Sequence, residues 1–252
     1  VTAGDPDPEK VVELLLTIAR SGADVIELGI PFSDPMADGP VIQRSSERAL
    51  SRGVNLAKCM DWVEKFRLSN QTTPVVMMGY ANPIEKFGVN KFASRAERSG
   101  VDGVLVVDYP PEECVDFCNK MKSHNVDVIF LLAPTTSLKR LNQIASLGSG
   151  YLYYVSLRGV TGASNIDILD VADRIKTIKN VTDLPVIVGF GISNPDSAAE
   201  VASTGSDGVV IGSAIIDKLD KAHRLGKNPL QEVSSFLKEI KKEMNTSVRI
   251  NN

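Results

Sequence analysis

The chain has 252 residues, of which 43% are hydrophobic and 23% charged, and its 28 basic and 31 acidic side chains give a net charge of −3. This near-neutral balance excludes a protein that coats nucleic acid, and the apolar content excludes a disordered chain. The longest apolar runs fall far short of the ~18 residues that a membrane-spanning helix needs.

We therefore expect a globular protein with neither nucleic acid nor a membrane as a partner. Three cysteines are too few for a disulfide framework, and no signal peptide opens the chain, so the cytoplasm is the expected location. Cys114 and Cys118 stand four residues apart in register with Phe117 and Met121, which predicts a buried helix face and not a metal or redox site. Neither histidine has a cysteine or histidine at ligand spacing, so no metal is expected.

Seven apolar runs rich in β-branched and aromatic residues alternate with segments of helical periodicity. The runs predict strands at residues 25–30, 75–80, 104–108, 128–133, 151–157, 186–190 and 209–212. Between them, apolar residues recur at helical spacing in three segments, namely Val11, Leu14, Leu15 and Ile18; Cys59, Val63 and Phe66; and Leu138, Leu141, Ile144 and Ala145. This alternation predicts successive strand–helix units.

The joints between these elements also repeat. The sequences Ser-Gly-Ala-Asp (21–24), Ser-Gly-Val-Asp (99–102) and Thr-Gly-Ser-Asp (204–207) each end a predicted helix, where glycine can adopt the left-handed conformation. Prolines and acidic residues at 7–9, 110–112 and 194–196 are typical of helix starts. No linker or change of composition divides the chain, so we expect one domain over residues 1–252.

Residues 1–4 have the composition of the end of a further strand, which would make eight. Eight parallel strands, each followed by a helix, form a (β/α)8 TIM barrel of the α/β class, here with a first strand cut short. A doubly wound open sheet is the alternative, but it normally carries a G-x-G-x-x-G turn after its first strand. The nearest match, at 189–194, ends in asparagine and comes late in the chain, so the barrel is favoured.

A glutamate interrupts the first of the seven runs. Alternation along the strand places Val25, Glu27 and Gly29 on one face and Ile26 and Leu28 on the other. If the second face packs against helices, Glu27 points into the barrel, where burial raises the pKa of a carboxyl group. We predict that Glu27 is a catalytic acid or base. The alternative is a structural ion pair, for which the sequence offers no strand-borne lysine or arginine nearby.

The loop that follows holds three prolines and a glycine within residues 31–40, which makes it stiff. It can therefore hold Asp34 or Asp38 in a fixed place over the mouth of the barrel, where barrel enzymes have their active sites. Alternatively, residues 38–40 only cap the next helix, which would start near Pro40.

Glycine clusters follow each of the last three predicted strands, at 159–162, 189–191 and 212–213. Barrels often bind phosphate with the loops after the last two strands, since glycine allows a close backbone approach and helix starts offer free N–H groups. Tight turns alone would explain any one cluster, but three together favour phosphate. No Walker sequence is present, which indicates a small phosphate ester and not a nucleoside triphosphate.

Two further observations narrow the chemistry. Tyr151 and Tyr153 share a face of the run at 151–157, so Tyr153 can come within reach of Glu27, although core packing also explains a strand tyrosine. No lysine lies in a predicted strand, which disfavours a Schiff-base aldolase, and no carboxylate–histidine cluster suggests a metal. The residues alone therefore predict metal-free acid–base chemistry on a phosphate ester.

Residues 23–43, Ala-Asp-Val-Ile-Glu-Leu-Gly-Ile-Pro-Phe-Ser-Asp-Pro-Met-Ala-Asp-Gly-Pro-Val-Ile-Gln, resemble the signature of the tryptophan synthase alpha chain family. Shorter motifs at 1–6, 80–83, 159–162 and 189–193 also fall where that family has them, so the resemblance runs nearly end to end. It implies a lyase that cleaves indole-3-glycerol phosphate to indole and glyceraldehyde 3-phosphate.

The resemblance also implies roles for single residues. Glu27 would be the general acid and base, Asp38 the carboxylate that accepts the indole N–H, and Tyr153 a tyrosine that assists Glu27. The implied phosphate site consists of Gly162, Gly191, Gly212 and Ser213, and the implied indole pocket of Tyr80, Leu105, Leu131, Thr161 and Phe190. Pro31 and Asp34 would belong to a loop that contacts a beta chain in an αββα assembly. This chain would need no cofactor, while the beta chain would carry pyridoxal phosphate.

The sequence departs from the family in two places: the first strand is a stub, and Arg158 stands in the loop after residue 157. Three alternatives remain open at this point. One is a stand-alone lyase that needs no beta chain. Another is a sugar-phosphate epimerase or isomerase, which would lack the signature that contains Glu27 and Asp38. The third is a non-catalytic interaction subunit that senses phosphate.

Overall fold

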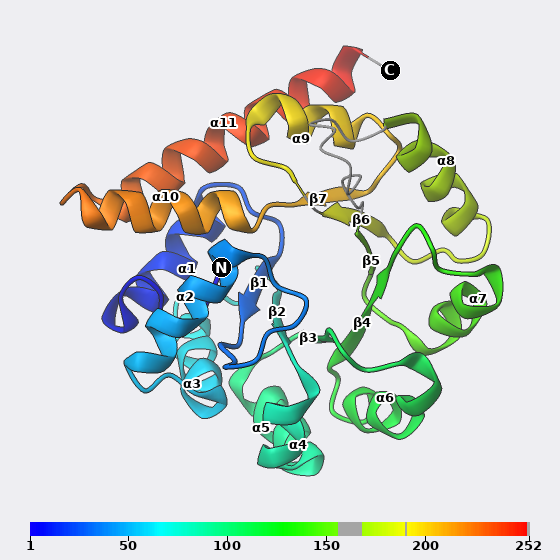
Figure 1. Cartoon of the computed structure of the whole chain (residues 1–252), viewed down its shortest axis with the longest axis horizontal. Coiled ribbons are helices and arrows are strands. Elements are labelled where there is room, and N and C mark those ends of the chain that lie inside the picture. Colours follow the sequence, from blue (N-terminus) through cyan, green and yellow to red (C-terminus); the bar gives the residue numbers. More distant parts are fainter. Residues whose placement is uncertain (156–167, 190, 251–252) are drawn as a thin grey trace.

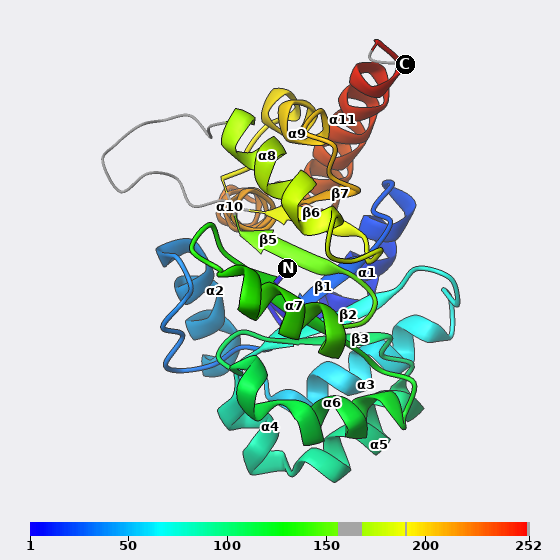
Figure 2. The same ribbon diagram turned by 90° about the vertical axis from the view of Figure 1, so that its right-hand side faces the viewer.

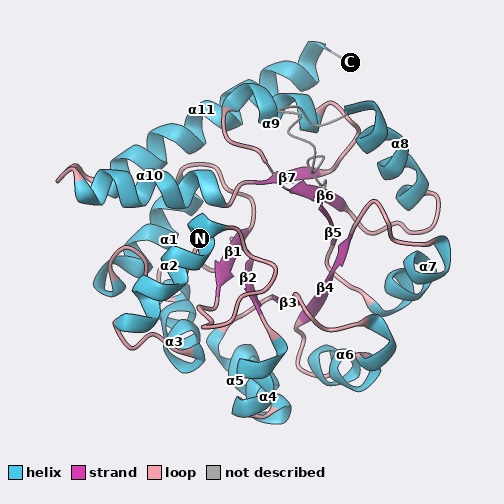
Figure 3. Cartoon of the chain, in the orientation of Figure 1, coloured by secondary structure: helices cyan, strands magenta, loops and turns pink. Residues whose placement is uncertain are grey.

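The structure, a computed structural model, describes residues 1–155, 168–189 and 191–250, the last four of them as backbone only. Its strands surround a common centre and its helices lie outside them (Figure 1, Figure 3). The strands are β1 (Ile26–Gly29), β2 (Val75–Gly79), β3 (Gly103–Val106), β4 (Asp127–Leu132), β5 (Leu152–Val155), β6 (Val186–Gly189) and β7 (Gly208–Val210).

The helices follow the strands in chain order around the ring. Seen from the side, α3–α6 cover one part of the sheet and α8–α11 cover the opposite part (Figure 2). The α-helices are α1 (Val11–Arg20), α2 (Pro40–Ser51), α3 (Leu56–Arg67), α4 (Ala81–Phe87), α5 (Val89–Ser99), α6 (Val115–Lys122), α7 (Leu138–Leu147), α8 (Ile168–Lys179), α9 (Pro195–Ala202), α10 (Ser213–Arg224) and α11 (Pro229–Ile250). None of the helices in the described part of the chain is both long and apolar enough to cross a membrane.

Each strand pairs in parallel with the next, in order from β1 to β7, and Glu27 stands opposite Val76 in this register. On the free edge of β1, Thr2 forms a parallel bridge with Gly29, and the Ala3 N–H donates to the Gly29 oxygen at 2.9 Å. The expected stub of a further strand is therefore present. The predicted barrel is confirmed and the doubly wound sheet is wrong, because that sheet would reverse its strand order. Among the described residues, no strand pairing joins β7 to the stub.

All seven strands start within one residue of the sequence prediction, but those described to their ends finish one or two residues earlier than predicted. Tyr80 was expected in a strand and instead precedes α4, in an extended conformation. The strand β2 ends at Gly79 because the last residue pair between β2 and β3 joins Gly79 to Val106. The predicted strand ends at Leu157 and Phe190 lie outside the described residues.

Side chains of the strands alternate between two layers. Ile26 and Leu28 point outward into the large core between strands and helices, while Glu27 is on the inner side. The inner side also holds a smaller apolar cluster, which consists of Val76, Leu105, Ile129 and Tyr151 with Met78, Val107, Leu131, Tyr153 and Ile187 packed against it. The predicted alternation in β1 is thus confirmed.

The helical periodicity is confirmed in α1, where the four apolar residues predicted to share a face are all buried. In α7 the prediction is wrong for Leu138, whose side chain is 59% exposed. Leu138 is the first helical residue, directly after the capping residue Ser137, and the buried face begins at Leu141. All three cysteines are buried and free.

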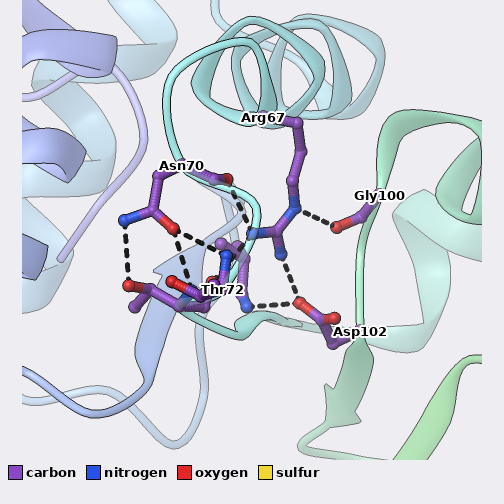
Figure 4. Close-up of polar contacts among 7 residues, drawn as sticks. Arg67, Asn70, Thr72, Gly100 and Asp102 are labelled. Atoms are coloured by element: carbon purple, nitrogen blue, oxygen red, sulfur yellow. Dashed lines mark hydrogen bonds and ion pairs between the residues drawn. The ribbon is translucent and has the colours of Figure 1, made fainter.

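The aspartates of two of the three repeated Gly-x-Asp joints, Asp102 and Asp207, connect neighbouring strands. The Asp102 carboxylate accepts a hydrogen bond from the Val75 N–H at 2.7 Å and one from Arg67, whose guanidinium also donates to the Gly100 oxygen at 2.8 Å (Figure 4). Gly100 itself has φ +76°, the left-handed conformation predicted for the end of a helix.

Asp207 repeats the arrangement between β6 and β7. Its carboxylate accepts from the Val186 N–H at 2.8 Å and from Lys179 at 2.8 Å. In both joints an aspartate fixes the first amide of the preceding strand and binds a cation from the preceding helix. These contacts stabilise the end of the barrel opposite the predicted active site, where such residues serve stability.

Candidate active site

A cavity of about 860 Å³ runs through the barrel. Glu27, Asp38, Tyr80, Tyr153 and Gly212 all line it, so it brings together residues from β1, the loop after β1, the end of β2, β5 and the start of α10. These segments are far apart in the sequence and meet because parallel strands direct all their carboxyl ends to one side of the barrel.

Glu27 lies inside the barrel, where it is half-buried and lines this cavity. Its Oε1 accepts a hydrogen bond of 2.7 Å from the Tyr151 hydroxyl. Burial raises the pKa of the Glu27 carboxyl, while the Tyr151 hydrogen bond opposes that rise. The site therefore favours a carboxyl group that keeps its proton at a higher pH than an exposed glutamate does.

Tyr153 was predicted to be the neighbour of Glu27, whereas Tyr151 was not predicted to contact it. Both tyrosines lie on the inner side, and burial, together with the Glu27 charge, raises the pKa of the Tyr153 phenol. The hydrogen bond to Glu27, however, comes from Tyr151. Period-two alternation identifies the face of a strand but not the height at which its residues meet another strand, and this height depends on the tilt of the strands.

Tyr80 connects β2 to the loop that carries Asp38. Its hydroxyl accepts a hydrogen bond from the Ala37 N–H at 3.1 Å, and its ring packs against Phe32 with a centroid separation of 5.3 Å. Burial raises the pKa of Asp38, and a hydrogen bond from Tyr80 opposes this rise. The helix α2 starts at Pro40 with Gly39 as its capping residue, as the alternative for residues 38–40 predicted, but the Asp38 side chain makes no capping hydrogen bond to it.

The loop after β1 has a buried base and an exposed tip. Pro31 is buried directly after the strand, whereas Asp34 is exposed and accepts a hydrogen bond of 2.6 Å from the Ser33 hydroxyl. The Met36 side chain is 83% exposed, which is unusual for a large apolar residue. The tip thus presents both a charge and an apolar group at the surface.

Gly212, which was predicted to bind phosphate, lies at the cavity wall directly before α10. Gly212 is the capping residue of the 12-residue helix α10, so no side chain caps the first amides of this helix. Gly212 lines the cavity together with Ile215. The first amides of a helix lack acceptors within the helix, so those of Ser213 and Ala214 are suited to an anion, whereas the Ile215 N–H already donates to the Gly212 oxygen at 3.0 Å. Gly191 has φ +76°, which favours glycine. Gly162, like Thr161 and Phe190 of the expected indole pocket, lies outside the described residues.

The expected apolar pocket differs in part from the wall of the cavity. Leu105 is fully buried and Leu131 is half-buried in the inner cluster, and neither lines the cavity. Val107 and Ile129 line it in their place, together with Tyr80. A shift of two residues along a strand keeps the face and changes the layer, which the sequence pattern does not distinguish.

Gly189 has a packing role that the sequence analysis did not predict. A Cβ atom added to Gly189 would lie 2.1 Å from the Tyr153 hydroxyl oxygen and 2.5 Å from the ring carbon that bears it. The first glycine of the cluster at 189–191 is therefore required so that Tyr153 can lie across β6.

Cationic and metal-binding groups are few around the cavity. No described strand carries a lysine, and Lys241 of α11, at the far end of the cavity, pairs with Asp24 at 2.5 Å. Within the described ranges, no three histidine, cysteine, aspartate or glutamate side chains are grouped so that they could hold a metal ion. The described residues that line the cavity offer carboxyls, phenols and backbone amides for chemistry.

The sequence model of the family described as tryptophan synthase alpha chain matches residues 1–245. The chain is 56% identical over 241 residues to the tryptophan synthase alpha chain of Polynucleobacter asymbioticus, an alignment that covers 96% of this chain and 90% of that relative. Its structure is similar to that of tryptophan synthase subunit alpha from Legionella pneumophila, with a TM-score of 0.91 and 42% identity, covering 98% of this chain and 91% of that one. It is also similar to a chain from a structure of the tryptophan synthase α2β2 complex of Pyrococcus furiosus, with a TM-score of 0.87, 38% identity and 95% of each chain covered.

The contact between Gly189 and Tyr153 can be tested by a double-mutant cycle. Gly189→Ala should lower the free energy of unfolding by about 1–3 kcal/mol, the usual effect of overpacking, because the new methyl group overlaps the Tyr153 phenol. In a Tyr153→Ala background the same change should have an effect of less than about 1 kcal/mol, since the space is then free. Urea unfolding of the four proteins measures both values. Equal effects in the two backgrounds would show that the two residues do not compete for space.

Proposed function

The chain belongs to the tryptophan synthase alpha chain family, and on this premise we propose how its own residues carry out the reaction. The enzyme is a lyase that splits indole-3-glycerol phosphate into indole and glyceraldehyde 3-phosphate by a retro-aldol reaction. In the proposal, Glu27 is the general acid and base, Asp38 stabilises the cationic intermediate, and the start of α10 binds the phosphate.

Glu27 acts twice in this mechanism. In its protonated form it donates a proton to C3 of the indole ring, which converts the ring to a cationic indolenine. The resulting carboxylate then takes the proton from the glycerol hydroxyl next to the breaking bond. The carbon–carbon bond breaks, its electron pair returns to the ring, and an aldehyde forms. A pKa raised by burial suits a group that must first give and then take a proton.

Asp38 has the complementary task. As a carboxylate it accepts the hydrogen bond of the indole N–H, whose positive charge grows when C3 is protonated. Its position on the cavity wall, with Tyr80 as a hydrogen-bond donor, supports this role. An anion fixed in advance next to a developing cation is among the largest contributions to catalysis. Tyr153, packed on Gly189, lies on the inner side of the barrel and is proposed to assist.

The phosphate group is proposed to bind at Gly212 and Ser213, with Gly191 and Gly162 completing the site. Gly212 begins α10 at the cavity wall, and the helix offers both free amides and a favourable dipole. The single observation that supports the whole proposal best is that Glu27, Asp38 and Gly212 line one cavity. The same residues would give the proton donor, the anion and the phosphate anchor that the reaction requires.

A tryptophan synthase beta chain is the proposed partner. The exposed loop tip with Asp34 and Met36 is the proposed contact, and the beta chain would hold pyridoxal phosphate, which has no role in the chemistry described above. The three free cysteines suit a reducing compartment, so we place the enzyme in the cytoplasm.

The role of Glu27 is tested with Glu27→Gln, which keeps the shape of the side chain and removes its acid–base function. Indole release from indole-3-glycerol phosphate should fall by about 10²–10⁴-fold, while the affinity for glycerol phosphate should stay unchanged. Glu13→Gln is the matched control, because Glu13 lies on the surface of α1 in a pair with Lys10 and should have full activity. A Glu27→Gln protein with full activity would disprove the assignment.

The partner loop is tested by charge reversal. Asp34→Arg should weaken the binding of a beta chain about tenfold, measured as the beta-chain concentration that gives half-maximal stimulation of indole release. Asp183→Arg is the control, since Asp183 is also exposed but lies between α8 and β6, at the opposite end of the barrel. Equal affinities would place the contact elsewhere, and no stimulation of the unsubstituted enzyme would favour a stand-alone lyase.

A further inference from the structure

The start of α4 has an unusual capping arrangement. The capping position is held by Tyr80, and its side chain makes no hydrogen bond to its own helix. Capping residues are usually short and polar, because their oxygen atoms accept from an amide of the first turn. The long Tyr80 side chain instead extends to the loop after β1, where its hydroxyl accepts from the Ala37 N–H. The helix therefore needs an acceptor from elsewhere.

Asp108 supplies this acceptor from the neighbouring strand. It follows the end of β3, and its Oδ1 accepts a hydrogen bond of 2.7 Å from the N–H of Ala81, the first residue of α4. The next residue, Tyr109, donates from its hydroxyl to Glu85 in the same helix. The loop after β3 thus holds α4 at two points, and the first of them is one residue from Tyr80.

The Tyr80 hydroxyl has a defined orientation at the other end of its side chain. Since its oxygen accepts from the Ala37 N–H, its own proton is available for the Asp38 carboxylate. Burial raises the pKa of Tyr80 to about 12, so the phenol remains a donor at all relevant pH values. The backbone of Tyr80 is fixed beside Asp108, and its hydroxyl is fixed beside Asp38.

We propose that Asp108 is a positioning residue for the cleavage reaction, which acts on Asp38 through Ala81 and Tyr80. Asp108 is exposed and does not line the cavity, so it has no contact with the substrate in this proposal. The inference rests on the proposed role of Asp38 and adds a residue from the loop after β3 to the support of that carboxylate.

The effect on pH dependence has a definite sign. The groups that face Asp38 are the Tyr80 phenol and, behind it, the Asp108 carboxylate; Glu27 shares the cavity, and Asp34 is exposed on the same loop. The Tyr80 hydrogen bond lowers the pKa of Asp38, so displacement of Tyr80 raises it. Because the reaction needs ionised Asp38, the acid limb of kcat/KM must then move to higher pH. Loss of the Asp108 charge alone would move the acid limb to lower pH, since a nearby negative charge raises the pKa of a carboxyl group and its removal lowers that pKa.

Two variants remove the contact from opposite sides. Asp108→Ala removes the acceptor, and Ala81→Pro removes the donor while Asp108 and its charge remain. Proline is well tolerated at the first position of a helix, and the extended conformation of Tyr80 suits a following proline. Each should lower kcat/KM by about tenfold, the effect of one lost charged hydrogen bond, and move the acid limb upward. Asp108→Asn keeps an acceptor oxygen and should restore activity to within about twofold, with no upward shift of the limb.

The coupling to Tyr80 decides between positioning and a merely structural role. In a Tyr80→Phe background, Asp108→Ala and Ala81→Pro should each change kcat/KM by less than about twofold, because the contact they support is already lost. Full additional losses in that background, or losses without a shift of the acid limb, would overturn the inference. Asp38→Asn keeps the two questions apart: full activity in Asp38→Asn would disprove the proposed function itself, whereas an inactive Asp38→Asn with additive Asp108 losses would disprove only the positioning role.

Discussion

The burial of the Glu27 carboxyl group inside the barrel is the constraint on which the rest of the site depends. Ile26 and Leu28 are almost fully buried in the outer core, so the alternation of the strand leaves Glu27 no direction but inward. An ionised carboxylate is costly in such surroundings, and the Tyr151 hydroxyl donates a hydrogen bond to it. The result is a carboxyl group that holds its proton more firmly than an exposed glutamate and still faces a cavity large enough for a substrate.

The two carboxyl groups of the site are supported in different ways. Glu27 belongs to a paired strand and is held by the sheet itself. Asp38 lies on a loop, and its position depends on contacts of that loop with the end of β2, mainly the Tyr80 hydroxyl and the packing of Tyr80 on Phe32. The opposite end of the barrel contains the aspartate contacts of Asp102 and Asp207, which join strands to one another and leave the carboxyl ends free for chemistry. This division of stability and function is usual for the fold.

Much of the fold could be predicted from the sequence, because strand and helix periods are local properties. The strand starts, the buried face of α1 and the inward direction of Glu27 all follow from spacing along a single element. The features that the sequence did not predict concern distances between elements. The hydrogen bond to Glu27 comes from Tyr151 and not from Tyr153. The cavity is lined by Val107 and Ile129 and not by Leu105 and Leu131. Both differences arise because the period and face of a strand do not give the height of a residue in the barrel.

Other features of the site could not be found by spacing because they depend on one particular neighbour. Gly189 stands in a cluster that suggested phosphate, yet the space it leaves is occupied by Tyr153. Tyr80 stands at the end of an apolar run that suggested a strand, yet it precedes a helix whose first amide donates to Asp108, from the loop after β3. A Gly-x-Asp sequence indicates the end of a helix through its glycine, whereas the hydrogen bonds of the aspartate become evident only when the next strand is in place.

The central claim, that the barrel raises the pKa of Glu27, is tested most directly by carbon-13 NMR titration of its side-chain carboxyl group. The resonance can be assigned by its absence in the Glu27→Gln protein. We expect a titration midpoint above the ordinary glutamate value of 4.5. The midpoint should be still higher in Tyr151→Phe, because this substitution removes a hydrogen bond that lowers the pKa of Glu27. A midpoint at or below 4.5 in the folded protein would contradict the central claim.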